Sequence, residues 1–203
     1  MRGTVTLVAL ALLAGCGVGG TEAPAKLPIP GLAAANGPTW TQDGDVAGSG
    51  TCVSTSVSPA PDNLQAMAAA VLCLVNTERR GAGLPALRPN GALKKASQRM
   101  ANLMVSERFF SHTTPDGRSL LDRVRPTGYI DGESWALGEN LAWGTGPLAT
   151  PRAIVNGWMD SPGHRANILY GKFRDIGIGI TLGAPRPDLS GGTTYVIDFG
   201  RHG

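Results

Sequence analysis

The chain has 203 residues, of which 42% are hydrophobic and 16% are charged, and this composition suits one globular domain with some length to spare. The formal net charge is only +3, and the sequence has no dense stripe of Lys and Arg interleaved with aromatic residues. Nucleic-acid binding therefore has little support, and we expect no nucleic-acid partner.

The N-terminus has the pattern of an export signal. The opening residues, MRGTVTLVALALLAGC, place Arg2 before an apolar run from Val5 to Ala14. This run is too short to cross a bilayer comfortably. We therefore interpret residues 1–15 as a signal peptide that is removed on export.

The residues LAGC at the end of this run resemble the lipobox of bacterial lipoproteins, in which the signal is cut before the cysteine. We expect Cys16 to carry a lipid that anchors the exported chain in the membrane at the cell envelope. The alternative is an ordinary signal peptide with an incidental cysteine, and hence a secreted protein. We favour the lipoprotein because the small residues and the cysteine follow where the apolar run stops.

The two remaining cysteines form an even pair. If Cys16 carries lipid, Cys52 and Cys73 are left in an exported protein, where disulfides form readily. We predict that they form a disulfide joining the N-terminal segment to the first helix. The alternative is two free thiols, one of them buried in that helix.

Residues 16–61 are rich in Gly, Ala, Pro, Ser and Thr and show no periodic pattern. Such a composition is typical of a flexible tether, here one that begins at the lipidated Cys16 and holds a domain off a membrane surface. We place the single folded domain at residues 62–203.

Four segments of this domain have the apolar spacing or the boundary residues of helices. The first begins after an N-cap, Asp62 or Asn63, and ends at a pair of glycines. The four segments cover residues 61–84, 90–109, 119–128 and 150–161.

Two later segments have the period of strands. DIGIGITLG at 175–183 alternates Ile with Gly, and TTYVIDFG at 193–200 has apolar residues at every second position. Residues 184–192 between them read as an exposed loop. Because helices come first and strands last, the sequence predicts an α+β fold with helices packed on a small antiparallel sheet.

Three residues are candidates for chemistry: His112 in FFSHTTPDG, Glu139 in GENLAW and His164 in SPGHRANIL. His164 lies in the first turn of a helix predicted to start at Ser161 and Pro162, where the helix dipole disfavours an imidazolium. A neutral imidazole can bind a metal or accept a proton. The alternative is that His164 only helps to cap the helix.

Glu139 is followed by apolar residues, so its carboxylate should be partly buried and needs a partner. One reading is structural, a hydrogen-bonded Glu that ties a loop to the end of a helix. The other is a site, since two neutral imidazoles and a carboxylate are the ligand set of some open zinc centres. The spacing along the chain does not decide between them.

Seven pieces of the sequence, in order, match one family: LVNTERRGAGLPAL, ASQRMANLM, FFSHTTPDG, GENLAWG, GWMDSPGHRANIL, DIGIGI and YVIDFG. On these motifs the chain from about residue 67 to 200 resembles the bacterial branch of the CAP superfamily, which comprises the cysteine-rich secretory, antigen 5 and pathogenesis-related proteins. Their domain is also called the SCP domain. The resemblance implies an α-β-α sandwich with a small antiparallel sheet between helices.

The family's central cleft typically carries two His and two Glu, and in some members it binds a divalent cation such as zinc. By this resemblance His112, Glu139 and His164 are the expected ligands of zinc or another divalent cation. The second Glu of the family is not matched, because the residues that follow Trp158 are Met159, Asp160 and Ser161.

The resemblance and the lack of an evident nucleophile favour a binding module, which presents a His/Glu cleft to a lipid, a glycan or a wall fragment at the cell envelope. The alternative is a zinc-dependent hydrolase, a peptidase or glycan hydrolase, with Glu139 as general base and His112 and His164 holding the metal. A third hypothesis is that these polar residues only stabilise the packing of helices across the sheet.

Overall fold

The computed structural model of the protein describes residues 6–10, 51–132, 134–189 and 191–202. Cys16, the expected site of lipidation, and most of the expected signal peptide and tether lie outside these residues. Among the helices in the described ranges, none combines the length and the apolar character needed to cross a bilayer.

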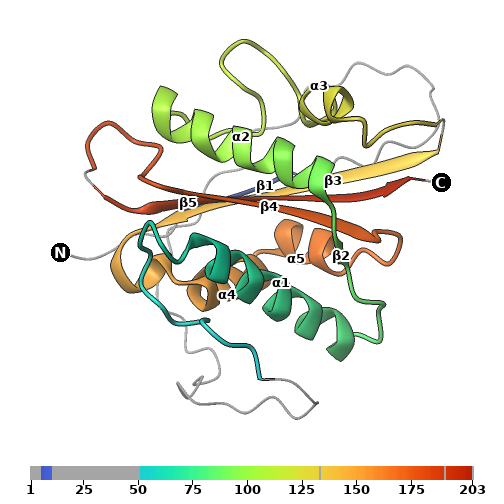
Figure 1. Cartoon of the computed structure of the whole chain (residues 1–203), viewed down its shortest axis with the longest axis horizontal. Coiled ribbons are helices and arrows are strands. Elements are labelled where there is room, and N and C mark those ends of the chain that lie inside the picture. Colours follow the sequence, from blue (N-terminus) through green and yellow to red (C-terminus); the bar gives the residue numbers. More distant parts are fainter. Residues whose placement is uncertain (1–5, 11–50, 133, 190, 203) are drawn as a thin grey trace. The chain divides into compact units, whose positions relative to one another are not determined.

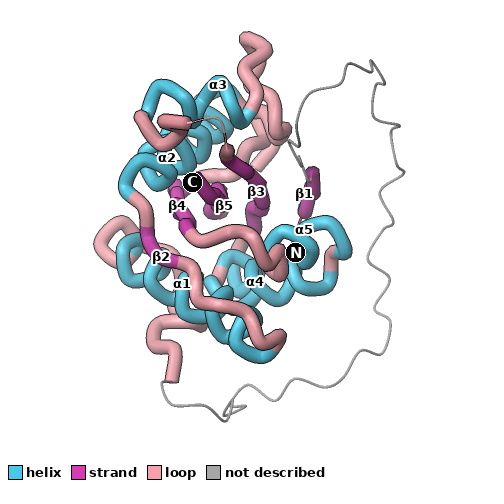
Figure 2. Tube along the Cα trace, turned by 90° about the vertical axis from the view of Figure 1, so that its right-hand side faces the viewer, coloured by secondary structure: helices cyan, strands magenta, loops and turns pink. Residues whose placement is uncertain are grey.

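The domain has three layers, with a sheet between two groups of helices (Figure 1). α2 and α3 cover one face of the sheet, and α1, α4 and α5 cover the other, as Figure 2 also shows. The helices are α1 (Leu64–Gly81), α2 (Gly91–Glu107), α3 (Leu120–Val124), α4 (Pro151–Asp160) and α5 (Pro162–Ile168), with short 3-10 turns η1 (Arg125–Thr127) and η2 (Gly146–Ala149). This arrangement confirms the predicted α-β-α sandwich.

The sheet has the strand order β1-β3-β5-β4-β2. Its strands are β1 (Thr6–Leu10), β2 (Arg88–Pro89), β3 (Trp135–Gly144), β4 (Asp175–Leu182) and β5 (Thr193–His202). All neighbouring pairs are antiparallel except β2 and β4, which run parallel over two residues. β4 and β5 were predicted, whereas β3 was not. Nine of the ten residues of β3 are buried, and a strand covered on both faces lacks the polar–apolar alternation that reveals a strand.

β1 comes from the segment that we expect to be removed as a signal peptide. Its residues pair antiparallel with β3, from Thr6 opposite Trp143 to Leu10 opposite Glu139. In the unprocessed chain β1 is therefore an edge strand of the sheet. Cleavage before Cys16 would remove it and leave β3 as the edge.

After β1, the compact unit resumes at Cys52, and the domain boundary at residue 62 stays a prediction. Cys52 forms the predicted disulfide with Cys73 of α1, and their Cα atoms are 5.7 Å apart. Nearby, the backbone N–H of Arg152 in α4 donates to the carbonyl of Thr55 at 2.8 Å. The segment before α1 is thus fastened to two helices of the same layer.

A buried arginine joins α1 to the turn that follows α5. Arg79 is fully buried, and its Nε donates to the carbonyl of Pro85 at 2.9 Å. Its Nη1 donates to the carbonyls of Ile168 and Tyr170, and its Nη2 to that of Phe173. These backbone acceptors satisfy the guanidinium away from water, so the end of α5 has a fixed place beside α1.

α2 packs very close to β4 because glycines of β4 face it. A Cβ atom on Gly177 would lie 2.1 Å from the backbone carbonyl carbon of Leu93, and one on Gly179 would lie 2.4 Å from that of Ser97. The isoleucines of the same strand point into the core shared with α1. The alternation of Ile and Gly therefore gives one helix layer a bulky surface and the other a flat one.

The side-chain amide of Gln98, on α2, pairs with the backbone of β4. Its Nε2 donates to the carbonyl of Ile180 at 3.0 Å, and its Oε1 accepts from the Ile180 N–H at 3.2 Å. These are the hydrogen-bonding positions that a neighbouring strand would use. Gln98 therefore covers the β4 edge beyond the short β2 strand.

Replacing Gly179 with Ala is expected to lower the free energy of unfolding by about 1–3 kcal/mol, because the new methyl group would overlap the backbone of α2. Urea unfolding followed by circular dichroism measures this loss. Gly91→Ala is the control, since a Cβ there meets nothing within 4 Å and Ala suits a helix at least as well as Gly. Equal stability of the two variants would contradict the close approach of α2 to β4.

Replacing both Cys52 and Cys73 with Ala is expected to lower the free energy of unfolding by about 3 kcal/mol, because the disulfide restricts the unfolded chain over a separation of 21 residues. Thermal unfolding with and without reductant measures the effect. Alkylation of the unreduced, denatured protein followed by mass spectrometry is an independent check. Modification of both thiols without reductant would show that the bond is not formed.

Candidate functional site

β3 presents alternate residues to the two helix layers, because successive side chains of a strand point to opposite faces. Leu137 packs against α2 and α3, and Leu141 packs against the buried methionines of α2. Glu139 lies between these two on the same face, whereas Asn140 faces α5. The GEN motif therefore sends its Glu and its Asn side chains into different layers.

Glu139 is the centre of a buried ionic cluster. Its side chain is only 2% exposed, and its Oε1 lies 2.7 Å from Nδ1 of His112. Its Oε2 accepts hydrogen bonds from Nη1 and Nη2 of Arg123, at 3.0 and 2.8 Å. The structure thus brings His112 and Glu139 together and adds Arg123, which the sequence did not single out.

Local structure places His112 and Arg123 beside β3. α2 ends at Glu107, and its C-cap residue Arg108 has a left-handed backbone (φ 56°) that turns the chain into the loop that carries His112. α3 then starts at a capping box formed by Ser119 and Asp122, which fixes the start of the helix that carries Arg123. Arg123 also donates to the carbonyls of Ser119 at 3.3 Å and His112 at 3.1 Å, so the loop and the helix are tied together.

His112 donates its Nδ1–H to Glu139, because a carboxylate held by a guanidinium only accepts hydrogen bonds. Its Nε2 atom is buried and has no hydrogen-bond partner among the described residues. In a neutral imidazole with a proton on Nδ1, Nε2 is the nitrogen that accepts a proton. His112 Nε2 could therefore accept a proton from a bound molecule. Among the described residues, however, no nucleophilic side chain is hydrogen-bonded to it.

Asp198 of β5 lies directly opposite Glu139 in the β3–β5 register. It is fully buried, and its Oδ2 accepts a hydrogen bond from Ser97 Oγ at 3.0 Å, while its Oδ1 has no partner among the described residues. Burial, and then the negative charge of Glu139, raise the pKa of Asp198 well above its ordinary value, against the opposing effects of Arg123 and Ser97. The fold therefore favours a neutral Asp198 beside the ion-paired Glu139.

The structure does not bring His164 to this cluster. His164 is buried on α5, which packs against the opposite face of the sheet. Its backbone carbonyl accepts a hydrogen bond from Asn140 Nδ2 at 3.0 Å, and Asn167 Nδ2 donates to Asn140 Oδ1 at 2.9 Å. The three residues expected to form one site therefore belong to two polar clusters, separated by β3.

The segment GWMDSPGHRANIL forms the end of α4 and all of α5. Trp158 is fully buried, and its Nε1 donates to the carbonyl of Leu141 at 3.1 Å, so it anchors α4 on β3. α5 begins at Pro162 after Ser161, as predicted, but the Ser161 side chain makes no capping bond to the described part of the helix. The start of α5 therefore rests on the fixed backbone angle of Pro162.

The residues around Glu139 do not fit a zinc site. His112 and Arg123 engage both carboxylate oxygens, and the guanidinium places a positive charge beside the carboxylate that a metal would need. Within the described residues, no group of three or more His, Cys, Asp or Glu side chains is placed to hold a metal ion. The three-ligand centre implied by the family resemblance is not assembled by these residues.

His202 ends β5 with its side chain 41% exposed. Its Nδ1 lies 3.6 Å from Asp131, its Nε2 lies 3.8 Å from Asp175, and its ring meets Tyr129 edge to face. These ion-pair distances are long, and we assign this group no function.

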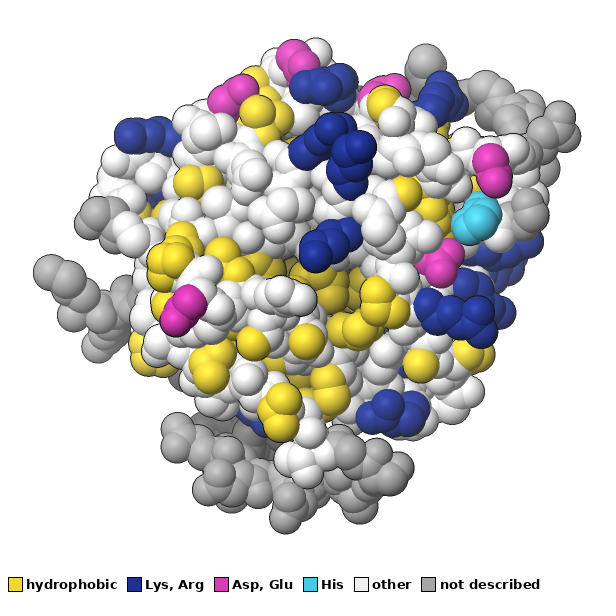
Figure 3. Space-filling model, in the orientation of Figure 1, with side chains coloured by type: hydrophobic (Ala, Val, Ile, Leu, Met, Phe, Trp, Pro, Cys, Tyr) yellow, Lys and Arg dark blue, Asp and Glu magenta, His cyan; other side chains and the backbone are white. Residues whose placement is uncertain are grey.

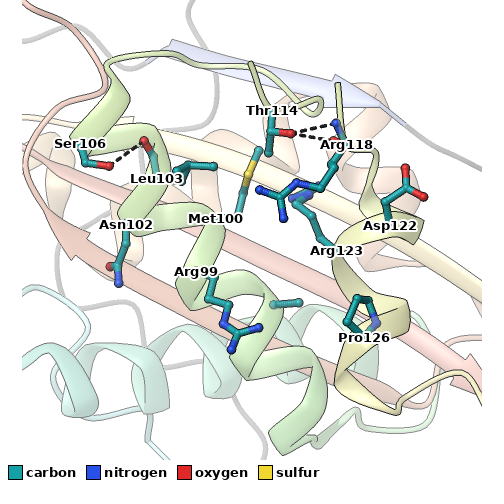
Figure 4. A pocket seen from close by; sticks show the side chains of 11 residues that line it. Arg99, Met100, Asn102, Leu103, Ser106, Thr114, Arg118, Asp122, Arg123 and Pro126 are labelled. Atoms are coloured by element: carbon teal, nitrogen blue, oxygen red, sulfur yellow. Dashed lines mark hydrogen bonds between the residues drawn. The ribbon is translucent and has the colours of Figure 1, made fainter. Parts of the chain in front are cut away.

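A surface groove of about 470 Å³ runs between α2 and the segment 114–126 (Figure 4). Ala96, Met100 and Leu103 of α2 give it an apolar floor. Arg123 also lines it, so the groove and the buried ionic cluster share one side chain. The groove therefore lies next to the site that contains Glu139.

The cations around the groove differ in their availability. All the guanidinium nitrogens of Arg123 donate to protein acceptors. Arg118 donates from Nε to Asp116 at 2.8 Å, but its Nη groups make no hydrogen bond to the described residues. Arg99 is exposed and makes no hydrogen bond or ion pair with other described residues. In the space-filling view, Lys and Arg side chains spread over the α2 layer, above a band of hydrophobic side chains over α1 (Figure 3). Arg99 and Arg118 are thus the guanidinium groups open to a ligand.

A family model described as CAP, the Cysteine-rich secretory protein family, matches residues 72–199. The match extends from α1 to β5 and covers more than half of the chain. The chain belongs to the CAP family.

Two relatives of this CAP protein come from Bacillus subtilis (strain 168). The uncharacterized protein YkwD is 33% identical over 124 residues, which make up 61% of this chain and 46% of YkwD. The uncharacterized membrane protein YlbC is 30% identical over 112 residues, which make up 54% of this chain and 30% of YlbC. The matched region thus spans less than half the length of each of these relatives.

Solved structures show the same fold. An extracellular protein containing an SCP domain from Bacillus anthracis is 24% identical, with a TM-score of 0.56 over 72% of this chain and 45% of that chain. An outer surface protein from Borrelia burgdorferi is 19% identical, with a TM-score of 0.55 over 70% of this chain and 95% of that chain. At these identities the likeness concerns the fold of the CAP domain.

Sequence reasoning missed two members of the ionic cluster. The sequence could have indicated Asp198, because an Asp between Ile197 and Phe199 in a buried strand has no route to solvent and needs a polar partner. Arg123 carried none, because a single Arg in a short helix is ordinarily a surface residue. Its role comes from an ion pair with Glu139, 16 residues further along the chain.

Asp198→Asn is expected to remove a pH-dependent destabilisation of the CAP domain. The folded-state pKa of Asp198 is raised above its unfolded value, so the native state loses stability as pH rises above about 4, by up to about 1.4 kcal/mol per pH unit until the folded pKa is reached. The stability of Asp198→Asn relative to the native protein should therefore be higher at about pH 8 than at about pH 5.

Urea unfolding of both proteins at the two pH values measures this difference. Asp160→Asn, at an exposed position, is the control and should show the same stability relative to the native protein at both pH values. A pH-independent difference for Asp198→Asn would contradict a neutral, buried Asp198.

Proposed function

We propose that this CAP protein is an exported binding module of the cell envelope that holds its ligand in the α2 groove. The main support is that the groove combines an apolar floor with the guanidinium groups of Arg99 and Arg118. The Arg123–Glu139 ion pair holds one wall of the groove in place. The groove volume of about 470 Å³ lies within the range of small-ligand sites.

Export is supported by the signal pattern at the N-terminus and by the descriptions of similar proteins. The Bacillus anthracis protein is described as extracellular, the Borrelia protein as an outer surface protein, and YlbC as a membrane protein. Lipid anchoring of this chain through Cys16 stays a prediction.

Of the ligand classes expected from the sequence, an anionic lipid matches the groove best. Leu103 and Pro126, backed by the buried Ala96 and Met100, line a surface for an apolar chain, and burial of that chain supplies most of the binding free energy. Arg99 and Arg118 supply charge-assisted hydrogen bonds for a phosphate or carboxylate. A neutral glycan would leave Arg99 without a charged partner and Arg118 with only its ion pair to Asp116, and a wall fragment would need to carry a carboxylate.

The contacts of Glu139 argue against a zinc-dependent hydrolase. A general base needs a free carboxylate oxygen within reach of a water, whereas His112 and Arg123 occupy both oxygens of Glu139. The metal that would activate the water has no assembled ligand set in the described ranges. Glu139 is better placed to orient His112 and to fix Arg123 as a wall of the groove.

Replacing Arg99 and Arg118 together with Ala is expected to weaken binding of a soluble short-chain phosphatidylglycerol by at least about tenfold, because two charge-assisted contacts are lost. Isothermal titration calorimetry measures the affinity, with short-chain phosphatidylcholine and a muropeptide as comparison ligands. Phosphatidylglycerol should bind more tightly than phosphatidylcholine.

The matched control is Arg165→Ala with Lys172→Ala, which removes two exposed cations from the opposite layer of the domain. This variant should bind like the native protein. Equal losses in the two double variants would mean that only net charge matters, and tighter binding of the muropeptide would redirect the proposal to wall fragments.

A further inference from the structure

We infer that Asp116 is a positioning residue of the α2 groove: it holds Arg118 in one orientation and so makes Arg118, rather than Arg99, the group that selects an anionic ligand. This inference rests on the proposed function, because it concerns how the same groove recognises the charged group of its ligand. Asp116 is not among the residues that line the groove, so it acts through Arg118.

The first support is the turn that contains Asp116. The Thr114 N–H donates to the carbonyl of Arg118 at 3.1 Å, and the Gly117 N–H donates to the carbonyl of Thr114 at 2.8 Å. Gly117 has a left-handed backbone (φ 85°), which a residue with a side chain rarely adopts. The backbone therefore fixes Asp116 and Arg118 relative to each other.

The second support is a series of hydrogen bonds between side chains of this turn. The Thr114 hydroxyl donates to Oδ1 of Asp116 and accepts from the backbone N–H of Arg118 at 2.9 Å. Oδ2 of Asp116 accepts from Nε of Arg118 at 2.8 Å. One oxygen of the carboxylate is thus fixed by the turn, and the other oxygen fixes the guanidinium.

The same contacts keep Asp116 ionised. The hydrogen bond from Thr114 is the largest cause that lowers the pKa of the Asp116 carboxyl, and the charge of Arg118 adds to it, against the opposing effect of desolvation. A carboxylate at neutral pH is a hydrogen-bond acceptor only, which suits it to hold Nε of an arginine.

The third support is the part of the Arg118 guanidinium that stays available. The guanidinium is a rigid, planar group, so fixing Nε also fixes the direction of its two Nη atoms. Those Nη groups make no hydrogen bond to the described residues, and Figure 4 shows the side chain extending from its turn toward α2. A phosphate or carboxylate can therefore accept two hydrogen bonds from donors that are oriented before binding.

Arg99 lies on α2, across the groove, and has no such partner. It is exposed, and no hydrogen bond or ion pair joins it to other described residues. Arg99 must lose rotamer freedom when it contacts a ligand, whereas Arg118 has lost part of that freedom on folding. Arg99 therefore adds a general attraction for anions, and Arg118 supplies the directed contact.

The pair is too exposed to matter for stability. The side chains of Arg118 and Asp116 are 55% and 57% exposed, and ion pairs of this kind contribute little to the free energy of unfolding. Loss of the Asp116 carboxylate should therefore show in ligand affinity and selectivity, with Tm close to that of the native protein.

The experiment measures the affinity of the full chain for short-chain phosphatidylglycerol and phosphatidylcholine by isothermal titration calorimetry. Asp116→Ala should weaken phosphatidylglycerol binding by about threefold, because Arg118 must then be ordered on binding. Asp116→Asn should lose less, because its amide oxygen can still accept from Nε. If Asp116 only repelled anions, both variants would bind phosphatidylglycerol more tightly, and that result would overturn the inference.

Single variants separate the two cations of the groove. Arg118→Ala should remove the preference for phosphatidylglycerol over phosphatidylcholine, and adding Asp116→Ala to it should cause no further loss. Arg99→Ala should keep the preference and lower affinity mainly at low salt, because the attraction of an exposed charge is screened. Equal loss of preference on Arg99→Ala and Arg118→Ala would contradict the inference.

The matched control is Asp188→Ala. Asp188 forms an exposed ion pair with Arg186, which is also two residues away along the chain, and neither residue lines the groove. This variant removes the same charge from a similar pair and should bind both lipids like the native protein. A threefold loss on Asp188→Ala would show that the effect of Asp116 is not local, and would overturn the inference.

Nuclear magnetic resonance of the ligand-free full chain separates this inference from the proposed function. The Nε–H of Arg118 should exchange with water more slowly than that of Arg99, and Asp116→Ala should remove the difference. Equal exchange in the native protein would overturn the inference while leaving the groove as the binding site. A native protein that does not bind phosphatidylglycerol would reject the proposed function, and the selective role of Arg118 with it, even if its Nε–H is protected.

Discussion

The burial of the Glu139 carboxylate is the constraint on which the rest of the site depends. A carboxylate that is 2% exposed in the middle of a sheet must be neutralised and hydrogen-bonded, or the fold would lose several kcal/mol. Arg123 and His112 meet this requirement, and to do so α3 and the loop after α2 must both lie against β3. The wall of the α2 groove is therefore set by an ion pair inside the domain.

The alternation of β3 decides how polar groups are divided between the layers. Glu139 joins α3 and the loop after α2 to the sheet, while the adjacent Asn140 bonds α5 through His164 and Asn167. Neighbouring residues of one motif thus serve two helix layers. The GEN sequence therefore has a structural role in both layers. For the same reason His112, which bonds to Glu139, and His164, which bonds to Asn140, lie on opposite faces of the sheet.

The proposed binding function depends on which cations are held by the fold and which can still bond to a ligand. Arg123 is bound by Glu139 and backbone carbonyls, and so acts as part of the framework, whereas Arg99 and Arg118 border a groove with an apolar floor. The glycines of β4 hold α2 close to the sheet, so the floor of the groove rests on rigid backbone contacts. A fixed apolar surface with free guanidinium groups beside it favours binding over catalysis.

The sequence by itself determined what local spacing controls: the approximate positions of the helices, the disulfide between Cys52 and Cys73, and the strands β4 and β5. The family resemblance added the sandwich and the nearness of His112 to Glu139. β3 was not predicted, because a strand buried on both faces has no alternation of polar and apolar residues. Only the tertiary structure decided that Arg123 holds Glu139 and that His164 lies across the sheet. The physical reason is that periodicity shows which face a residue occupies, whereas a buried charge finds its partner through the packing of elements distant in the chain.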